Sequence, residues 1–249
     1  MIPNNQIWYC ANNEIICRDD CCNATVIASN WNNLTLQGVW TFDSDIIEIG
    51  ASAFERGYMF SMTLPESVKE IRSEAFAYSH LAGIVIPRNV TTIGYDAFHG
   101  CPFLSVVSFP DNLVCIGRGA FQSCEWLESI DLPAKIRTIE SSLFRDCESL
   151  TDVSLPEQVI KIREYAFYKC ISLESLVLPQ TVKSIGDFAF GNCYALKEIY
   201  CKAIVPPAGG MGMFQHSRCK IYVPAESVDR YKKAQYWSYY LDRIKGYEF

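Results

Sequence analysis

Cysteine and histidine are the side chains in this sequence whose types and spacing could do chemistry. The chain has 249 residues, with twelve cysteines and three histidines. Five cysteines recur at steps of 23 residues: Cys101, Cys124, Cys147, Cys170 and Cys193. On neighbouring strands they would lie about 4.8 Å apart, which suits metal ligands or disulfides. We favour buried thiols, because free cysteine packs as a small hydrophobic residue and because Gly57 and Ser79 replace it in the same frame.

A second group of cysteines lies near the N-terminus: Cys10, Cys17, Cys21 and Cys22. Their spacing matches no common zinc module, and adjacent cysteines are awkward as tetrahedral ligands. We therefore expect free thiols or one disulfide in this segment. A thiol-dependent or metal-binding role for residues 10–22 is kept as an alternative function.

Residues for catalysis do not assemble into a recognisable pattern. His99 lies two positions before Cys101 and could suggest a Cys–His nucleophile. Because Cys101 belongs to the regular column, we expect His99 to be an exposed turn residue. Asp19 and Asp20 fall in an expected loop with no sign of a cleft, and neither a glycine-rich phosphate loop nor G-x-S-x-G occurs. The sequence predicts a protein that is not an enzyme and that needs no cofactor or metal.

The elements that would position these residues form a repeat of 22–23 residues. The unit reads L-x-x-I-x-L-P-x-x-V-x-x-I-x-x-x-A-F-x-x-C-x-x, and its isoleucines and phenylalanines recur in step from Ile49 and Phe54 to Ile185 and Phe190. Apolar residues two apart point to one face of a short strand, and the proline ends that strand. One copy cannot bury its apolar residues alone. Stacked copies would bury them in a continuous core beside a parallel ladder of strands.

This pattern predicts an α/β repeat solenoid, a right-handed coil with short helical or 3-10 turns and capped ends. We expect strands near residues 40, 62, 84, 107, 130, 153, 176, 199 and 221, in a stack roughly 40 Å long. An N-terminal cap is assigned to residues 1–38, the repeats to 39–202, and an irregular last rung with a helical cap to 203–249. In that cap Val228, Tyr231 and Ala234 share one helical face, and Leu241 and Ile244 complete the lid.

The repeat closely resembles the BspA-like branch of leucine-rich repeats. The resemblance is carried by the unit from Ser129 to Cys147, by Trp40-Thr41-Phe42-Asp43 and by Tyr222-Val223-Pro224-Ala225. It extends over nearly the whole chain and is similar to bacterial members from gut Bacteroidetes. It implies a leucine-rich-repeat coil. It also implies an extracellular or cell-surface location, since members are mostly exported or surface proteins and some are implicated in adhesion to host matrix proteins or other cells.

Composition limits the classes of partner. The formal charge of −6 and the pI near 5.2 disfavour nucleic acid, because phosphate binding needs a concentrated basic surface. No apolar run approaches the roughly eighteen residues that span a bilayer. The first residues, Met1 to Gln6, lack the basic and then apolar layout of a signal peptide.

The outward positions of the expected strands are the remaining candidate surface. They are mostly small or hydroxylated, with an acidic patch, and such a surface lets a partner approach closely. The candidate binding residues are Glu128, Ser129, Asp131, Asp152, Ser154, Ser175 and Tyr200. We expect a protein-binding module whose partner, a host matrix or bacterial surface protein, presents a basic patch. A structural spacer in a surface assembly is the main alternative.

Overall fold

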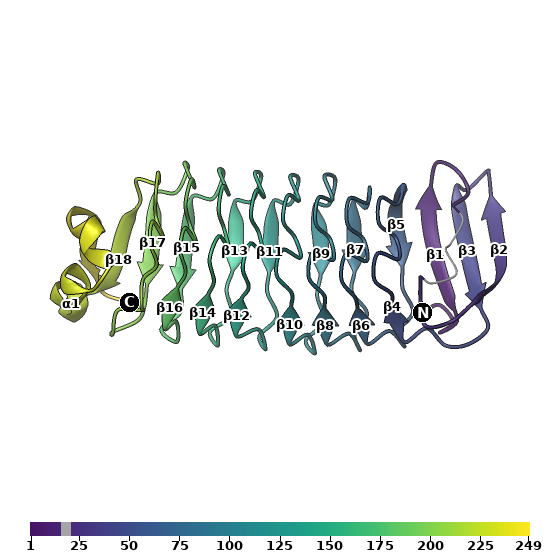
Figure 1. The fold of residues 1–249 in the computed structure, drawn as a ribbon, viewed down its shortest axis with the longest axis horizontal. Coiled ribbons are helices and arrows are strands. Elements are labelled where there is room, and N and C mark those ends of the chain that lie inside the picture. Colours follow the sequence, from purple (N-terminus) through teal and green to yellow (C-terminus); the bar gives the residue numbers. More distant parts are fainter. Residues whose placement is uncertain (16–20) are drawn as a thin grey trace.

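The protein is an elongated coil of successive turns, seen in a computed structural model that describes residues 1–15 and 21–249 (Figure 1). Most repeats contribute one longer strand and one two-residue strand. The longer strands are β5 (Met59–Thr63), β7 (Gly83–Val85), β9 (Val106–Ser108), β11 (Ser129–Asp131), β13 (Asp152–Ser154), β15 (Ser175–Leu178), β17 (Glu198–Cys201) and β18 (Lys220–Pro224). The short strands are β4 (Glu48–Ile49), β6 (Glu70–Ile71), β8 (Thr92–Ile93), β10 (Cys115–Ile116), β12 (Thr138–Ile139), β14 (Lys161–Ile162) and β16 (Ser184–Ile185).

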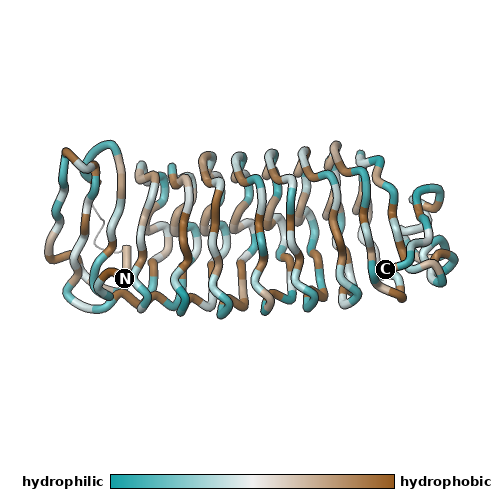
Figure 2. The backbone as a smooth tube through the Cα atoms, turned by 180° about the vertical axis from the view of Figure 1, so that it is seen from behind, coloured by the Kyte–Doolittle hydropathy of each residue, from teal (hydrophilic) through white to brown (hydrophobic). Residues whose placement is uncertain are grey.

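Both sets of strands pair in parallel, as the repeat predicts. Ile130 on β11 lies opposite Val153 on β13, and Ile162 on β14 lies opposite Ile185 on β16. Equivalent residues of successive repeats are thus in register. Hydrophobic positions consequently recur at corresponding places in successive turns of the chain (Figure 2). The parallel repeat coil expected from the sequence is confirmed.

Each longer strand divides its side chains between the core and solvent. In β11, Ile130 is buried while Ser129 and Asp131 are exposed. In β13 the same alternation buries Val153. Side chains on a strand alternate between its faces, so one row of residues along the whole coil points outward. We call this row the strand face.

The turn around each Ala-Phe pair is formed by backbone bonds between neighbouring repeats. Phe144 donates its N–H to the carbonyl of Ala166 at 2.8 Å, and Leu143 donates to Glu140 at 3.2 Å within its own turn. Ser142 and Asp146 on either side have positive φ angles. Left-handed residues interrupt a helix, so the expected helical turns are single turns closed three residues back.

Phenylalanine rings form a column inside the coil. They are buried, and adjacent rings stack with centroids 5.1–6.0 Å apart. The column comprises Phe54, Phe76, Phe98, Phe121, Phe144, Phe167, Phe190 and Phe214. Trp40 stacks on its first ring at 5.6 Å, and Trp237 meets its last ring edge-on at 6.0 Å. A single aromatic core therefore joins both ends of the molecule.

The N-terminal end differs from the expected first rung. Trp40 and Phe42 on β3 (Gln37–Phe42) are buried, as the pattern requires. However, β1 (Gln6–Ala11) lies between β3 and β5 and is antiparallel to both, while β2 (Val26–Asn32) pairs on the outer side of β3. Opposite Gly38, the ring of Tyr9 fills the space that a side chain would occupy, which holds β1 at this place. The strand near residue 40 is thus not a member of the parallel ladder.

The C-terminal end is closed by a short helical segment and one further strand. It comprises η1 (Ala225–Ser227), α1 (Val228–Lys233), η2 (Trp237–Arg243) and β19 (Ile244–Tyr247). Tyr231 is buried, and its hydroxyl donates to the carbonyl of Ala203 at 2.6 Å. Ile244 is buried because β19 adds to β18 in parallel, a pairing that the sequence did not reveal. Leu241, expected to complete the lid, is exposed, because η2 turns its side chain away from the core.

Candidate functional site

The column of repeat cysteines lies inside the coil and serves packing. All five side chains are buried free thiols, which confirms the prediction. The Cys147 thiol donates to the carbonyl of Phe121 at 3.0 Å, and the Cys170 thiol donates to that of Phe144 at 3.1 Å. Burial raises the pKa of Cys147 to about 12. A thiol without water access or thiolate character is a poor nucleophile.

The N-terminal cysteines do not form a metal centre in the part of the chain that the structure describes. Cys10 and Cys22 are free thiols, and Cys21 is disulfide-bonded. Cys17 lies outside the described residues, as do Asp19 and Asp20. Within residues 1–15 and 21–249, no group of three potential ligands among His, Cys, Asp and Glu could hold an ion. The structure therefore adds nothing in favour of the metal-binding alternative.

His99 lies in a turn, as predicted, but it is half-buried rather than exposed. Its ring meets that of Tyr78 edge-on, with centroids 4.9 Å apart, and this neighbouring ring covers part of it. The thiol of Cys101 instead donates to the carbonyl of Phe76 at 3.0 Å and contacts the hydroxyl of Ser79. The geometry thus offers no support for a Cys–His pair.

The acidic candidates come together on the strand face. Ser129 lies opposite Asp152, and Asp131 lies opposite Ser154, across the β11–β13 pair. Four of the predicted residues line a shallow depression of about 340 Å³: Asp131, Asp152, Ser154 and Ser175. Glu128 is exposed immediately before β11. Six of the seven candidates therefore lie on β11, β13 and β15 or directly beside them.

Several other acidic groups along the coil have an ion-pair partner within the chain. In some of these pairs the base lies one repeat away, as in Arg163–Glu140 at 2.9 Å and Lys197–Glu174 at 2.8 Å. Among the residues described, the carboxylates of Glu128, Asp131 and Asp152 have no ion-pair partner within the chain. They are left available to a basic group from outside.

Tyr200 lies apart from the acidic depression. Its ring stacks on Tyr222 with centroids 4.9 Å apart, and Tyr247 meets both rings at an angle. The Tyr200 hydroxyl donates to Glu198 at 2.6 Å, and this bond raises the pKa of Tyr200 to about 12. The residue belongs to a tyrosine cluster over β17, β18 and β19. The sequence did not distinguish this cluster from the rest of the strand face.

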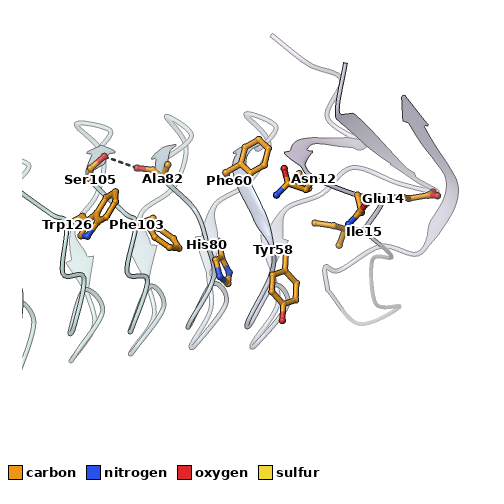
Figure 3. Close-up of a pocket in the computed structure, with 12 residues that line it drawn as sticks. Asn12, Glu14, Ile15, Tyr58, Phe60, His80, Ala82, Phe103, Ser105 and Trp126 are labelled. Carbon is orange, nitrogen blue, oxygen red and sulfur yellow. Dashed lines mark hydrogen bonds between the residues drawn. The ribbon is translucent and has the colours of Figure 1, made fainter. Parts of the chain in front are cut away.

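Sequence reasoning also missed a row of partly exposed aromatic rings. Tyr58, His80, Phe103 and Trp126 lie on four consecutive turns, and their centroids are 5.0, 5.5 and 5.3 Å apart (Figure 3). We call this row the aromatic ladder. It lines a cleft of about 820 Å³, of which the segment after β1, residues 11–15, forms another wall. A signal was present, since each ring directly precedes the repeat leucine or its Met59 counterpart.

Comparison with known proteins assigns the repeats. A family described as the BspA-type leucine-rich-repeat region matches residues 28–151 and 114–218, with six copies. The chain belongs to this family. The BspA-type repeats therefore account for most of the coil, and with the parallel strands they define it as a leucine-rich-repeat solenoid.

Solved structures of this repeat type are similar to the chain over most of its length. The leucine-rich-repeat protein TpLRR of T. pallidum is 34% identical, with a TM-score of 0.55 over 61% of this chain and 71% of TpLRR. A leucine-rich cell surface protein from Faecalibacterium prausnitzii is 25% identical, with a TM-score of 0.48 over 72% of this chain and 57% of that protein. No curated protein matches the sequence. Among the described residues, no helix is long and apolar enough to cross a membrane.

Proposed function

We propose that this protein is a non-catalytic binding module that engages a protein partner through the acidic part of its strand face. The observation that carries the proposal is the depression between β11, β13 and β15, where Asp131 and Asp152 are exposed and, among the described residues, have no ion-pair partner, unlike several other acids of the coil. A basic patch on the partner fits this surface. Exposed charge pairs each contribute little, so area and shape would supply most of the affinity and charge would guide the approach.

We further propose that binding takes place at a cell surface, as adhesion to a host matrix or bacterial surface protein. Membership in the BspA-type family supports this location, because the resemblance noted above is to proteins that are mostly exported or surface-bound. A spacer in a surface assembly remains the competing role. It differs in one measurable respect, because a spacer needs no ligand on the strand face.

The test begins with a pull-down against host matrix and bacterial surface proteins, followed by affinity measurements on the captured partner. Asp131→Lys with Asp152→Lys adds repulsion as well as removing attraction. We expect binding to weaken about tenfold or more, mainly through slower association that depends on salt. Asp111→Lys with Asp242→Lys makes the same change of net charge at two exposed acids elsewhere and serves as the control.

Full binding by a correctly folded Asp131→Lys, Asp152→Lys protein would refute the strand-face assignment. An equal loss in the control pair would show that net charge, rather than this surface, determines affinity. Failure to capture any matrix or surface protein at micromolar concentrations would favour the spacer role.

A further inference from the structure

The aromatic ladder is exposed although the fold has no need of it. Trp126 is 57% exposed and Tyr58 is 73% exposed, while the phenylalanine column closes the core separately. Position by position, later repeats carry Ser149, Ser172 and Ala195 where these rings stand. The same turn thus forms without an aromatic residue. Contiguous exposed apolar surface of this kind marks an interaction site more often than a packing requirement.

Carboxylates lie in the cleft wall and beside Trp126 in the sequence. Glu14 lies in the wall contributed by the segment after β1. Glu125 and Glu128 flank Trp126 in the sequence and are both exposed. Within residues 1–15 and 21–249, those that line the cleft include no lysine or arginine. The cleft therefore combines aromatic rings with carboxylates, which is the combination that recognises a cationic group.

The ring geometry leaves one position for such a cation. Tyr58 and His80 are stacked at 25°, and His80 is tilted by 32° to Phe103, so these rings partly cover one another. Trp126 is turned by 88° to Phe103 and has no other ring contact among the residues described. An indole is the aromatic group that binds cations best. In the sequence it lies between two exposed acidic residues, Glu125 and Glu128.

The chain leads directly from the cleft to the acidic strand face. Glu128 follows Trp126 by two residues and directly precedes Ser129 of β11, which lies opposite Asp152. A ligand that leaves the cleft at the Trp126 end would therefore reach the acidic depression. An extended peptide segment has the length to contact both places.

We propose that the aromatic ladder is the docking cleft for an extended segment of a partner protein, one that places a lysine or arginine side chain against Trp126 and apolar side chains against the other rings. This inference rests on the proposed function, because it adds an anchor site to the strand-face surface. The acidic surroundings repel anionic glycans and nucleic acids. A neutral glycan would gain nothing from the charge, so its binding is treated as an opposing outcome.

The test selects heptapeptides from a random displayed library on the whole protein, then measures one enriched peptide by calorimetry. We expect enriched sequences to carry lysine or arginine beside apolar residues. Trp126→Ser introduces the residue that the chain itself uses at this position in two later repeats, so the fold should be retained. It should weaken peptide binding at least about tenfold, as expected for a central aromatic anchor.

Three controls sharpen the result. Trp126→Phe keeps an aromatic face and should restore part of the affinity. Tyr194→Ser removes an exposed aromatic residue on a distant turn, outside the described lining of the cleft, and should change nothing. Replacing the basic residue of the peptide by glutamine should weaken binding as much as Trp126→Ser does, because the two changes remove the same contact.

The proposal is overturned if no peptide is enriched, if enriched peptides lack a basic residue, or if Trp126→Ser binds them as well as the original protein. Binding of a neutral glycan array that is lost in Trp126→Ser would assign the cleft to sugars instead. The two proposals can fail independently. If the Asp131→Lys, Asp152→Lys protein still binds the full-length partner while Trp126→Ser no longer binds the peptide, the strand-face proposal is refuted and the cleft proposal stands. The opposite pattern of results would refute the cleft proposal and support the strand-face proposal.

Discussion

Replacing Phe144 by alanine should destabilise the protein more than almost any single surface change. The ring has no solvent exposure and stacks between Phe121 at 6.0 Å and Phe167 at 5.4 Å. Truncation removes the buried ring and both stacking contacts and leaves a cavity, for a total of about 3–5 kcal/mol. We expect the upper half of this range. The neighbouring rings cannot close the gap, because the N–H groups of Phe121 and Phe167 are bonded to adjacent turns at 3.1 and 2.8 Å.

The measurement is urea unfolding at 25 °C, followed by circular dichroism and by tryptophan fluorescence so that coincident transitions justify a single free energy of unfolding. Phe144→Leu refills most of the volume and should cost less than about 1.5 kcal/mol. Asp131→Ala, on the strand face of the same repeat, should stay within about 0.5 kcal/mol. Equal losses for Phe144→Ala and Asp131→Ala would refute the assignment of inward and outward faces.

Two further predictions concern the buried thiols. Thiol reagents should spare Cys124, Cys147 and Cys170 in the native protein and label them on unfolding, since these side chains are buried; mass-spectrometric detection of a Cys124–Cys147 bridge would contradict this. Stability should also fall as the pH rises from about 8.5 towards 12. Burial raises the pKa of Cys147 to about 12, so the unfolded chain loses the proton first, and the free energy of unfolding drops by up to about 1.4 kcal/mol per pH unit for each such thiol. Below about pH 8.5 the full stability is present. Cys147→Ser, which copies Ser79 in the same column, should reduce the slope in urea titrations between pH 9 and 11; an unchanged slope would argue against this thiol as a source of it.

The repeated part of the fold could be predicted from the sequence because its buried residues recur with a single period of 22–23 residues. Ile162 and Phe167 recur at fixed steps, and a stack of equivalent turns is the arrangement that buries both. The strand face followed from the same alternation. The grouping of Asp131 and Asp152 could also be predicted, because parallel pairing places the strands of neighbouring repeats side by side in register.

The ends and the aromatic ladder were not predictable in this way. Trp40 fits the repeat pattern by residue type, but the insertion of β1 beside it depends on pairing between distant segments, which local periodicity does not encode. The sequence predicts that Ile244 is buried, but no repeat motif indicates that it lies on a strand paired with β18. Trp126 and Phe103 occupy a position whose residue type varies from repeat to repeat. The periodic pattern therefore does not indicate that their rings form a row.

The place of β1 sets an order on folding during synthesis. Trp8 faces Val39 on one side and Thr63 on the other, so β1 finds its two partners only after both of these later segments have been synthesised. Most later strands of the coil, from β7 onward, pair with a strand of the turn made just before them. Once β1 has paired with β3 and β5, both of its edges are occupied. Further turns of the coil can then be added only on the C-terminal side of β5. Growth of this protein is therefore vectorial, in step with translation, and a stalled chain that ends soon after residue 63 should already hold a closed N-terminal end.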